Sequence, residues 1–319
     1  MEPVVSIVRV FCYTDEKMNY SPLRYPGGKS SLYDFLKRTI QANNIIDGIY
    51  VEPFAGGAGA ALKLLMLEDV YQIYLNDKDE MVYKFWHSIL NHTEEFIELI
   101  YNCKINIEEW NYRRQILQDS NLRNNLSDLE IGFTTFYLNR CNRSGILKAG
   151  VIGGNNQEGD WKIDARFNKA DLISKIEKIA YYKERIKIYN QDAVVFLKNI
   201  EKNIVDKQNL LVYLDPPYVE QGEGLYNAFF REDDHVRLSK FLQKKLSSNW
   251  LVSYDDHPLI HKIYKEVNKN IFEFNYFANR TKVGRELVIC SKNCKMTNSY
   301  LHYSKTKVLP DLTNEVIAV

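Results

Sequence analysis

The sequence lacks the cysteine pattern of a secreted or zinc-binding protein. Its five cysteines are an odd number, lie far apart and include no CxxC pair, which argues against both a disulfide framework and a zinc site. It also lacks a long apolar run and a basic-then-apolar beginning, so we expect neither a membrane-spanning helix nor a signal peptide. These absences favour a reduced compartment, and we expect a cytoplasmic protein.

The sequence has almost no net charge. Its 42 basic and 41 acidic residues leave a formal charge of +1 over 319 residues, so any binding of nucleic acid needs a local basic patch. Histidine is scarce as well. The six histidines are scattered, and the helically spaced pair His257 and His261 lacks an HExxH motif. We therefore predict no metal site.

The most informative stretch is residues 211–218, Leu-Val-Tyr-Leu-Asp-Pro-Pro-Tyr. The apolar run predicts a buried strand, which ends at Asp215 because neither Pro216 nor Pro217 can donate to a strand ladder. The resulting stiff corner presents a carboxylate, a free backbone carbonyl and the ring of Tyr218 together. Two acceptors and a stacking ring suit a flat substrate that carries an amino group. Read alone, the same residues also fit an ordinary proline turn.

A glycine-rich turn follows an earlier predicted strand. Residues 49–51 run into Glu-Pro-Phe-Ala-Gly-Gly-Ala-Gly at 52–59, after which a helix is expected from Ala60 to Glu68. A strand, a glycine-rich turn and a helix form the opening unit of a nucleotide-binding α/β sheet. Leu62 occupies the third glycine position of the dinucleotide fingerprint, which disfavours NAD and FAD.

Two further stretches predict ligand contacts around this sheet. The strand expected at 72–77 ends at Asp77, about 20 residues after the glycine-rich turn, where an acceptor for ribose hydroxyls belongs. An acid at a strand end can also simply be solvated, but its position after this turn favours the ribose role. Upstream, Tyr-Pro-Gly-Gly-Lys at 25–29 precedes a helix expected from Leu32 to Ile40, an arrangement that can wrap a ligand at a helix N-terminus. A phosphate-binding loop would need glycine in place of Leu23. A plain turn fits residues 25–29 equally well.

The rest of the chain predicts more strands and a helical insertion. Strands are expected at 185–192 and 250–255, with a closing hairpin at 271–274 and 286–290, whereas residues 81–128 show only a helical pattern. Two basic clusters contain the Arg and Asn side chains that suit contacts with base edges, although ordinary solvated loops fit them too. They comprise Arg140, Asn142, Arg143 and Lys148 in one loop, and Arg280, Lys282 and Arg285 in another.

Taken in order, four motifs resemble the Dam-like adenine-specific DNA methyltransferases: residues 25–29, 52–59, 76–77 (Asn-Asp) and 215–218 (Asp-Pro-Pro-Tyr). The resemblance covers about residues 20–292, with 137–140 similar to the family's target-recognition hairpin and 286–289 similar to its last strand. It implies an α/β fold with the Rossmann-like sheet of methyltransferases that depend on S-adenosylmethionine (SAM). A helical target-recognition domain would be inserted into this sheet. The implied division is a SAM-binding catalytic domain at 20–80 and 168–292, a helical DNA target-recognition domain at 81–167, and a peripheral tail at 293–319.

The resemblance also implies roles for individual residues. Asp215 and the Pro216 carbonyl would accept the N–H bonds of the target base, with Pro217 shaping the corner and Tyr218 stacking on the base. Asp77 would bind the ribose hydroxyls of SAM and Asp192 its adenine amino group. The other SAM contacts would come from Tyr25, Gly27, Gly28, Lys29, Glu52, Phe54, Gly56, Gly57 and Asp215. Both basic clusters would border the cleft above the Asp-Pro-Pro-Tyr corner.

The activity that this resemblance implies is site-specific transfer of a methyl group from SAM to the exocyclic amino group of adenine in double-stranded DNA. The base would be flipped out, in a restriction-modification, phage or epigenetic context, and a cognate restriction endonuclease is a partner that the first context allows. An amino-methyltransferase acting on cytosine, RNA or a protein amide fits the same corner. Leu23 opposes a nucleotide hydrolase, and a non-catalytic DNA-binding module would not need both a cofactor loop and this corner.

Overall fold

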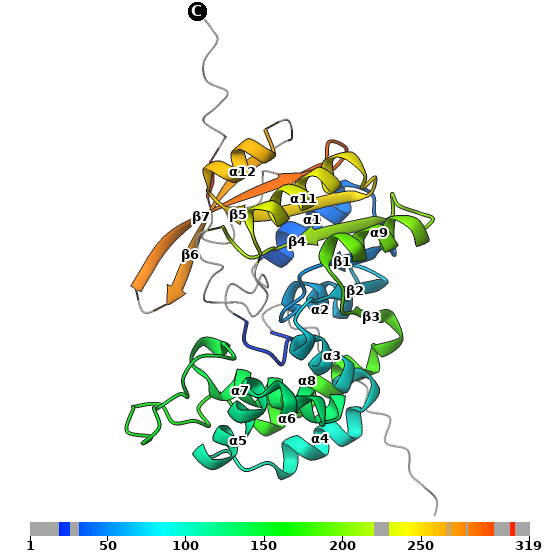
Figure 1. Cartoon of the computed structure of the whole chain (residues 1–319). Helices are drawn as coiled ribbons and strands as arrows, with labels where there is room; N and C mark the ends of the chain where they lie inside the picture. Colours follow the sequence, from blue (N-terminus) through cyan, green and yellow to red (C-terminus); the bar gives the residue numbers. More distant parts are fainter. Residues whose placement is uncertain are drawn as a thin grey trace, which may run out of the picture.

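An eight-stranded sheet forms the upper half of the computed structural model, and a group of helices lies below it (Figure 1). The structure describes residues 19–25, 32–219, 230–265, 267, 269–278, 280–296 and 307–309, and for 269–286 and 307–309 it describes the backbone alone. The strands are β1 (Ile49–Glu52), β2 (Gln72–Asn76), β3 (Ile186–Tyr189), β4 (Leu210–Leu214), β5 (Asn249–Asp255), β6 (Lys269–Ala278), β7 (Arg280–Cys290) and β8 (Lys307–Leu309). The helices are α1 (Tyr33–Ala42), α2 (Gly59–Met66), α3 (Glu80–Asn91), α4 (Thr93–Asn102), α5 (Ile107–Gln118), α6 (Ser120–Asn124), α7 (Asp128–Cys141), α8 (Lys169–Tyr181), α9 (Ala193–Asn203), α11 (Glu232–Lys244) and α12 (Pro258–Ile263), with short 3-10 turns η2 (Arg143–Gly145) and η3 (Lys183–Arg185).

Five strands of the sheet are parallel and follow the order β3-β2-β1-β4-β5. Strand β7 then pairs antiparallel with β5, β6 with β7, and β8 with β6. The strand order reverses between β1 and β4, which pair from Ile49 with Leu210 to Val51 with Val212. Because an open α/β sheet binds its ligand beyond the carboxyl ends of its strands at such a reversal, β1 and β4 fix the position of the site in this Rossmann-like fold.

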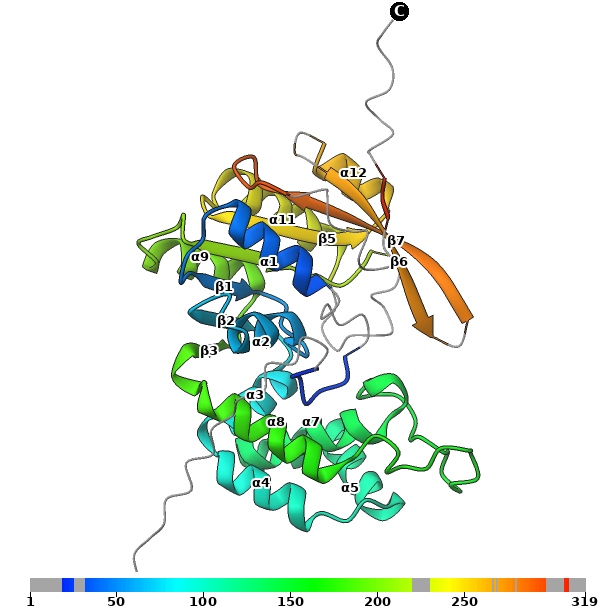
Figure 2. The same ribbon diagram turned by 180° about the vertical axis from the view of Figure 1, so that it is seen from behind.

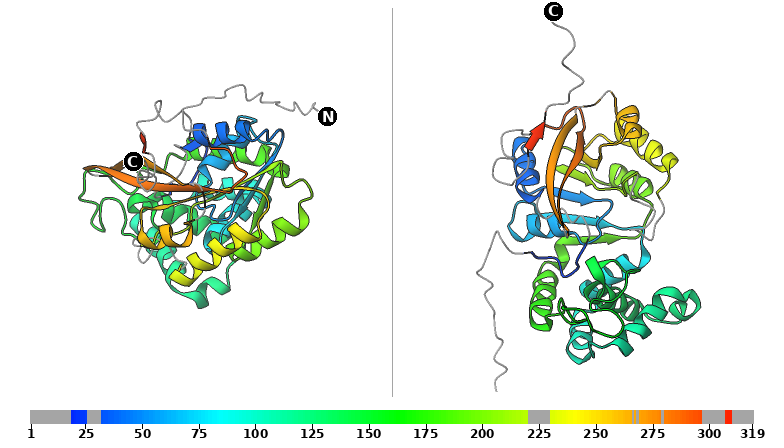
Figure 3. Two further views of the ribbon diagram at one scale, coloured as in Figure 1. Left: turned by 90° about the horizontal axis from the view of Figure 1, so that it is seen from above. Right: turned by 90° about the vertical axis from the view of Figure 1, so that its left-hand side faces the viewer.

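Helices cover both faces of the sheet (Figure 3). On one face, Tyr50 and Leu211 share a core with α1 and α2, whereas on the other face Val51 and Val212 pack with α9 and α11. Neighbouring residues of one strand therefore bury against opposite layers, as the two-residue period of a strand requires. This double burial explains why β4 is apolar along its whole length.

Helices α3 to α8 form the helical lobe below the sheet (Figure 2). At its centre, α7 packs on α3, and the rings of Phe85 and Phe136 are stacked with centroids 6.1 Å apart. The two helices come this close because a Cβ at Gly132 would lie 2.5 Å from the Lys84 carbonyl oxygen. Helix α8 packs against α3 and α4, so the helical lobe includes it. The division into domains at residues 81 and 167 stays a prediction.

The structure confirms the predicted alternation of strands and helices and the helical insertion. Strands β1, β2, β4 and β5 each begin within one residue of the expected position. The continuous helical pattern of 81–128 is divided into separate helices because capping side chains interrupt it. Asn106, Asp119 and Ser127 each accept a hydrogen bond from the first turn of the helix that follows.

Two predictions about the basic clusters are wrong. Residues 137–140, including Arg140, lie in the last turn of helix α7 rather than in a hairpin or a loop. The helical hydrogen bonds continue as far as the Asn142 N–H, which donates to the Leu138 carbonyl at 2.8 Å. Residues 280, 282 and 285 lie in strand β7 rather than in a loop, because the β6–β7 hairpin remains paired as far as Ala278 and Arg280. In Figure 1 this hairpin and the loop that follows α7 project from the same side of the molecule.

Candidate active site

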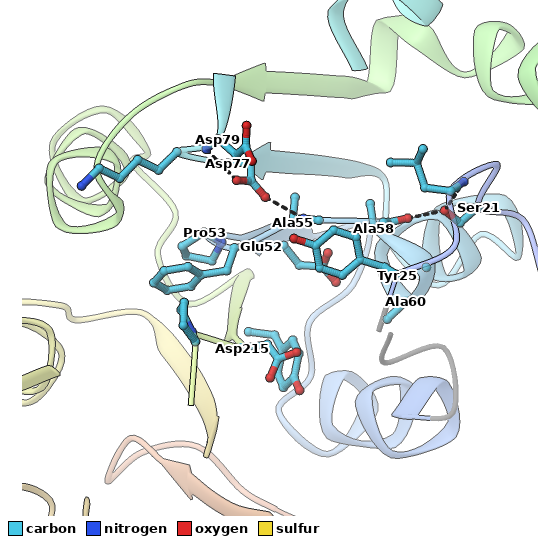
Figure 4. A pocket seen from close by; sticks show the side chains of 18 of the residues that line it. Ser21, Tyr25, Glu52, Pro53, Ala55, Ala58, Ala60, Asp77, Asp79 and Asp215 are labelled. Carbon is cyan, nitrogen blue, oxygen red and sulfur yellow. Dashed lines mark hydrogen bonds between the residues drawn. The ribbon is translucent and has the colours of Figure 1, made fainter. Parts of the chain in front are cut away.

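A cavity of about 400 Å³ opens beyond the carboxyl ends of β1 and β4, where the strand order reverses (Figure 4). Its wall is formed by residues 19–25, the glycine-rich turn 52–60, the loop 77–79 after β2 and the corner that follows β4. Ser144, from the helical lobe, also lines it. The volume is in the range of a site for one small ligand.

The glycine-rich turn is fixed in shape by contacts on its outside. The φ angle of Gly56 is +47°, and a Cβ there would lie 2.6 Å from the ring of Tyr25, so only glycine fits. The carbonyl oxygen of Gly56 accepts a hydrogen bond of 2.9 Å from the indole of Trp86, and that of Gly57 accepts one of 2.5 Å from the Ser21 hydroxyl. Residues of the helical lobe and of segment 19–25 thus both hold this turn.

Asp77 follows β2 and joins two parts of the cavity wall. One carboxylate oxygen accepts a hydrogen bond from the backbone N–H of Gly56 and the other accepts from that of Asp79, each at 2.9 Å. Burial and the neighbouring Asp79 carboxylate raise the pKa of Asp77 to about 7, although the two N–H donors act in the opposite direction. A ligand that donates hydrogen bonds here would favour the ionised form.

Glu52, the last residue of β1, is 6% exposed. Its carboxylate accepts a hydrogen bond of 3.0 Å from the Tyr50 hydroxyl. Burial, reinforced by the negative charge of Asp215, raises the pKa of Glu52 to about 8 even though Tyr50 opposes the change. Two acidic side chains from the two central strands therefore face one cavity, and a bound cation would offset their repulsion.

Asp215 and the two prolines form the predicted corner after β4. The Ser253 hydroxyl donates a hydrogen bond of 3.1 Å to Asp215, and it accepts one of 2.8 Å from Tyr213 because its own proton is already used. Pro217 lines the cavity. Beyond the corner, the Val219 N–H donates to Asp255 at 3.2 Å and fixes the path of the chain. A carboxylate held by the neighbouring strand is thus presented at the cavity.

Asp192 also lines the cavity, but its carboxylate is already engaged. One oxygen caps helix α9 by accepting from the N–H groups of Val194 and Val195, and the other accepts a hydrogen bond of 2.6 Å from Arg237. Burial opposes ionisation, yet Arg237 and the capping donors together hold the pKa of Asp192 below its ordinary value. The predicted contact with an adenine amino group would therefore have to share these oxygens.

The family model of D12 class N6 adenine-specific DNA methyltransferases matches residues 25–280. The chain belongs to this family. It is therefore an adenine-specific DNA methyltransferase, an enzyme that transfers a methyl group to adenine in DNA and needs a methyl donor.

Two curated relatives are similar to this methyltransferase along most of their length. The retron Ec67 DNA adenine methylase of Escherichia coli is 23% identical over 270 residues, which cover 82% of this chain and 85% of the relative. The type II methyltransferase M.CviBI of Paramecium bursaria Chlorella virus NC1A is 24% identical over 286 residues, covering 83% and 95%. Among solved structures, the rRNA methyltransferase AviRa of Streptomyces viridochromogenes aligns with 85% of this chain and 87% of its own, at 12% identity and a TM-score of 0.36.

Most of the predicted cofactor residues of the methyltransferase meet at one place. Gly27, Gly28 and Lys29 lie outside the described residues. Pro216 is buried and Tyr218 is half-buried at the corner after β4. The predicted residues that line this cavity are Tyr25, Glu52, Phe54, Gly56, Gly57, Asp77, Asp192, Asp215 and Pro217.

The predicted DNA contacts differ in how accessible they are. Arg143 and Lys148 are exposed in the loop after α7. Arg140 is half-buried, and its Nε donates a hydrogen bond of 2.6 Å to the Arg166 carbonyl oxygen. Asn142 is fully buried, accepts from the Trp110 indole at 2.7 Å and donates to two backbone carbonyls. Its amide is therefore engaged inside the lobe and is not available to DNA.

The second basic cluster, Arg280, Lys282 and Arg285, lies on strand β7, where the structure describes the backbone alone.

Among the described residues, no group of three His, Cys, Asp or Glu side chains could hold a metal ion. None of the helices in that part of the chain combines the length and the apolarity needed to cross a membrane.

Three contributors to the site escaped sequence reasoning. Ser21 bonds the glycine turn, Ser253 bonds Asp215, and Arg237 bonds Asp192, although each lies more than thirty residues from its partner. No local pattern marks any of them. For Ser253 an indirect signal existed, since it lies two residues before the end of the strand expected at 250–255.

Proposed function

We propose that this methyltransferase moves the methyl group of SAM to the exocyclic nitrogen of an adenine flipped out of duplex DNA at a specific site. The observation that carries the proposal is the meeting of Asp215 and Glu52 in one cavity at the reversal point of the sheet. One carboxylate serves the target base and the other serves the cofactor. The division into a SAM-binding domain at 20–80 and 168–292 and a recognition domain at 81–167 is part of this proposal.

The cavity suits SAM because SAM is a cation. The negative charge of Asp215 disfavours the ionised form of Glu52, and the ammonium and sulfonium groups of SAM would favour it. Each oxygen of Asp77 holds one backbone donor and can accept a second bond from a ribose hydroxyl. When bound, SAM supplies an electrophilic methyl group on its sulfur. Phe54 and Phe230, whose rings meet edge to face at 5.6 Å, would offer apolar contact to its adenine.

The corner after β4 would align the target base. The Asp215 carboxylate and the Pro216 carbonyl accept the two N–H bonds of the amino group, which turns the nitrogen lone pair towards the methyl group. Ser253 holds the Asp215 carboxylate in orientation, and Tyr218 would stack on the base. Catalysis then consists mainly of alignment and of acceptors that face the developing positive charge. The proton leaves for solvent after transfer, so Asp215 need not be a strong base.

Base flipping follows from where the reacting atom lies. The exocyclic nitrogen of adenine is held in a base pair within the duplex, and the cavity lies beyond the carboxyl ends of β1 and β4. The nucleotide must therefore leave the duplex to bring this nitrogen into the cavity. The loop after α7 and the β6–β7 hairpin project from the same side of the molecule (Figure 1), and we place the duplex between them. Arg143 would read a base edge, and phosphate contacts would come from Arg140, Lys148, Arg280, Lys282 and Arg285.

The names of the two relatives support the biological context that we propose. One is named for a retron and the other is a type II methyltransferase, so both names come from mobile or modification systems. We propose that this enzyme acts in a phage or restriction-modification context, where a cognate endonuclease would be its partner and the cytoplasm its compartment.

Mass analysis of nucleosides tests the proposal. The protein is incubated with DNA and methyl-labelled SAM, and the DNA is digested. We expect the label on N6-methyladenine alone. Label on cytosine, on RNA or on protein would support the broader amino-methyltransferase instead. Hydrolysis of ATP without any transfer of label would favour a nucleotide hydrolase.

A further inference from the structure

A short segment, residues 19–25, lies between the sheet and the helical lobe (Figures 1 and 2). It belongs to no helix or strand, so its conformation depends on the contacts on its two sides. On the cofactor side, the Ser21 hydroxyl bonds the Gly57 carbonyl at 2.5 Å, and the Tyr25 ring fills the space that a side chain at Gly56 would need (Figure 4). This side therefore shapes the cavity wall.

The other side of segment 19–25 is bound by helix α7. The side chain of Asn139 accepts a hydrogen bond from the Arg24 N–H and donates one to the Arg24 carbonyl, both at 2.7 Å. The single amide of Asn139 thus makes the same two hydrogen bonds to Arg24 that a paired residue of a neighbouring strand would make. Arg140 adds a bond to the Pro22 carbonyl at 3.4 Å, and the ammonium of Lys178 lies 4.6 Å from the centre of the Tyr20 ring.

Asn139 also holds the turn that begins the predicted recognition loop. It is 3% exposed, and its amide donates a further hydrogen bond of 2.8 Å to the Gly145 carbonyl. Gly145 has a φ of +75°, and a Cβ there would lie 2.1 Å from the Arg24 carbonyl oxygen. The residue before it, Ser144, lines the cavity. One amide therefore joins segment 19–25, the recognition loop and, through them, the cavity wall.

Cations gather at this junction. Burial and the charge of Arg166 lower the pKa of Arg24, and burial and the charge of Arg24 lower the pKa of Arg140 to about 10. These arginines repel one another in the described structure, and a DNA phosphate would relieve that repulsion. Engagement of DNA would thus act on the same residues that Asn139 ties to the cofactor cavity.

We infer that Asn139 is a positioning residue that couples occupancy of the cofactor cavity to engagement of DNA by the helical lobe, through segment 19–25. The inference rests on the proposed function, in which the cavity binds SAM and the lobe binds DNA. A ligand that orders the segment from one side lowers the cost of ordering it from the other. Each ligand should therefore tighten the binding of the other by the same factor.

The coupling factor is measured from two titrations of the full chain. A fluorescent DNA duplex library, randomised at its centre, is titrated with protein in the absence and in the presence of saturating S-adenosylhomocysteine. The ratio of the two dissociation constants is the coupling factor, which we expect to be about tenfold for the wild-type protein. In Asn139→Ala we expect it to fall to nearly one, and Ser21→Ala, which cuts the bond at the other end of the segment, should do the same.

Thr135→Val is the matched control. Thr135 is buried on the same helix and its hydroxyl donates to the Met81 carbonyl at 3.0 Å, so the change removes a buried hydrogen bond without touching segment 19–25. We expect this variant to keep the wild-type factor. A merely structural role of Asn139 would weaken both ligands in the variant while leaving the factor unchanged.

The outcomes separate this inference from the proposed function. If Asn139→Ala does not melt cooperatively, Ser21→Ala carries the test. A wild-type factor of one with both probes bound, or wild-type factors in both variants, overturns the coupling and leaves the methyltransferase proposal intact. A wild-type protein that binds neither probe overturns both.

Discussion

Three of the carboxylates around the cavity fall into two groups that differ in their partners. Glu52 ends β1 and is buried, whereas Asp77 follows β2 and is half-buried. Each lies near another acid, and their pKa values are raised to about 8 and about 7. Asp192, which follows β3, caps a helix and pairs with Arg237, and its pKa is lowered. The carboxylates of the first group need a ligand with positive charges or hydrogen-bond donors to favour their ionised forms, whereas Asp192 already has such partners in the protein. The positive groups and hydroxyls of the cofactor should therefore lie at β1 and β2.

The largest effect should come from the acid that faces the target base. Asp215→Ala removes the side-chain acceptor of the corner, and we expect the methylation rate to fall by about two to three orders of magnitude, with DNA affinity nearly unchanged. Initial rates with labelled SAM measure it. Asp171→Asn, an acid paired with Lys175 on the surface of α8, is the control, and a rate for Asp215→Ala within a few-fold of wild type would remove Asp215 from catalysis.

Within the first group, Asp77→Ala should weaken SAM binding by about 1–3 kcal/mol, the cost of hydrogen bonds left unpaired. Calorimetry with SAM gives the change directly. Asp77→Asn separates the charge from the shape of the side chain, because it keeps one acceptor oxygen. Unchanged affinity in both variants would show that Asp77 does not contact the cofactor.

The recognition loop shows the same contrast between an engaged residue and an available one. Arg143 is exposed, whereas its neighbour Asn142 is buried and fully bonded. Arg143→Ala should weaken binding to the recognised site by about 1–3 kcal/mol and relax discrimination there, which methylome sequencing would detect. An unchanged motif of unchanged strictness in this variant would show that Arg143 reads no base.

Lys282→Ala tests the other cluster. It should weaken binding to all DNA sequences alike and lower the slope of affinity against salt concentration by about one.

The pH dependence of SAM binding tests the first group without mutation. Both acids are partly protonated in the ligand-free protein near neutral pH, and a cationic ligand with hydroxyl donors favours their ionised forms. Affinity should therefore rise with pH, by about tenfold between pH 6 and pH 8, and level off above the raised pKa values. Titrations in buffers of different ionisation enthalpy should show proton release on binding. A flat profile would contradict the assignment.

The same raised pKa values should make the ligand-free protein less stable as pH rises. Between about pH 4 and pH 8, Glu52 and Asp77 bind more protons in the folded chain than in the unfolded chain. Their contribution to the free energy of unfolding should therefore fall as pH rises through this range. Thermal melting with and without SAM should show the stabilisation by SAM growing as pH increases.

The smallest effect should come from the second group. Arg237 is about half exposed, with 48% of its side chain accessible, and exposed ion pairs contribute only up to about 1 kcal/mol. Arg237→Ala should thus change SAM affinity by less than about 1 kcal/mol, measured by the same calorimetry. A loss of SAM affinity as large as that of Asp77→Ala would mean that Asp192 and Arg237 act on the cofactor together. The distinction between the two groups of carboxylates would then be wrong.

The parts of the molecule that the sequence predicted correctly are those with local causes. The Asp-Pro-Pro-Tyr corner and the glycine-rich turn each combine an apolar strand with residues that must end it, and both lie where expected. Asn142 was misread because an Asn beside two arginines looks the same whether its amide meets DNA or the Trp110 indole. Its burial depends on helix α5, which is distant in the sequence. The same reason hid Ser21 and Ser253, whose partners are brought close only by the fold.

The bond from the Trp86 indole to the Gly56 carbonyl has a consequence for engineering. Trp86 lies on α3, the first helix of the lobe that we expect to choose the DNA sequence, yet it holds the glycine turn of the cofactor cavity. Exchanging whole lobes between relatives to change the target site would therefore also replace a support of the cavity. A graft that begins after α3 and retains Trp86 should transfer recognition with less damage to the chemistry.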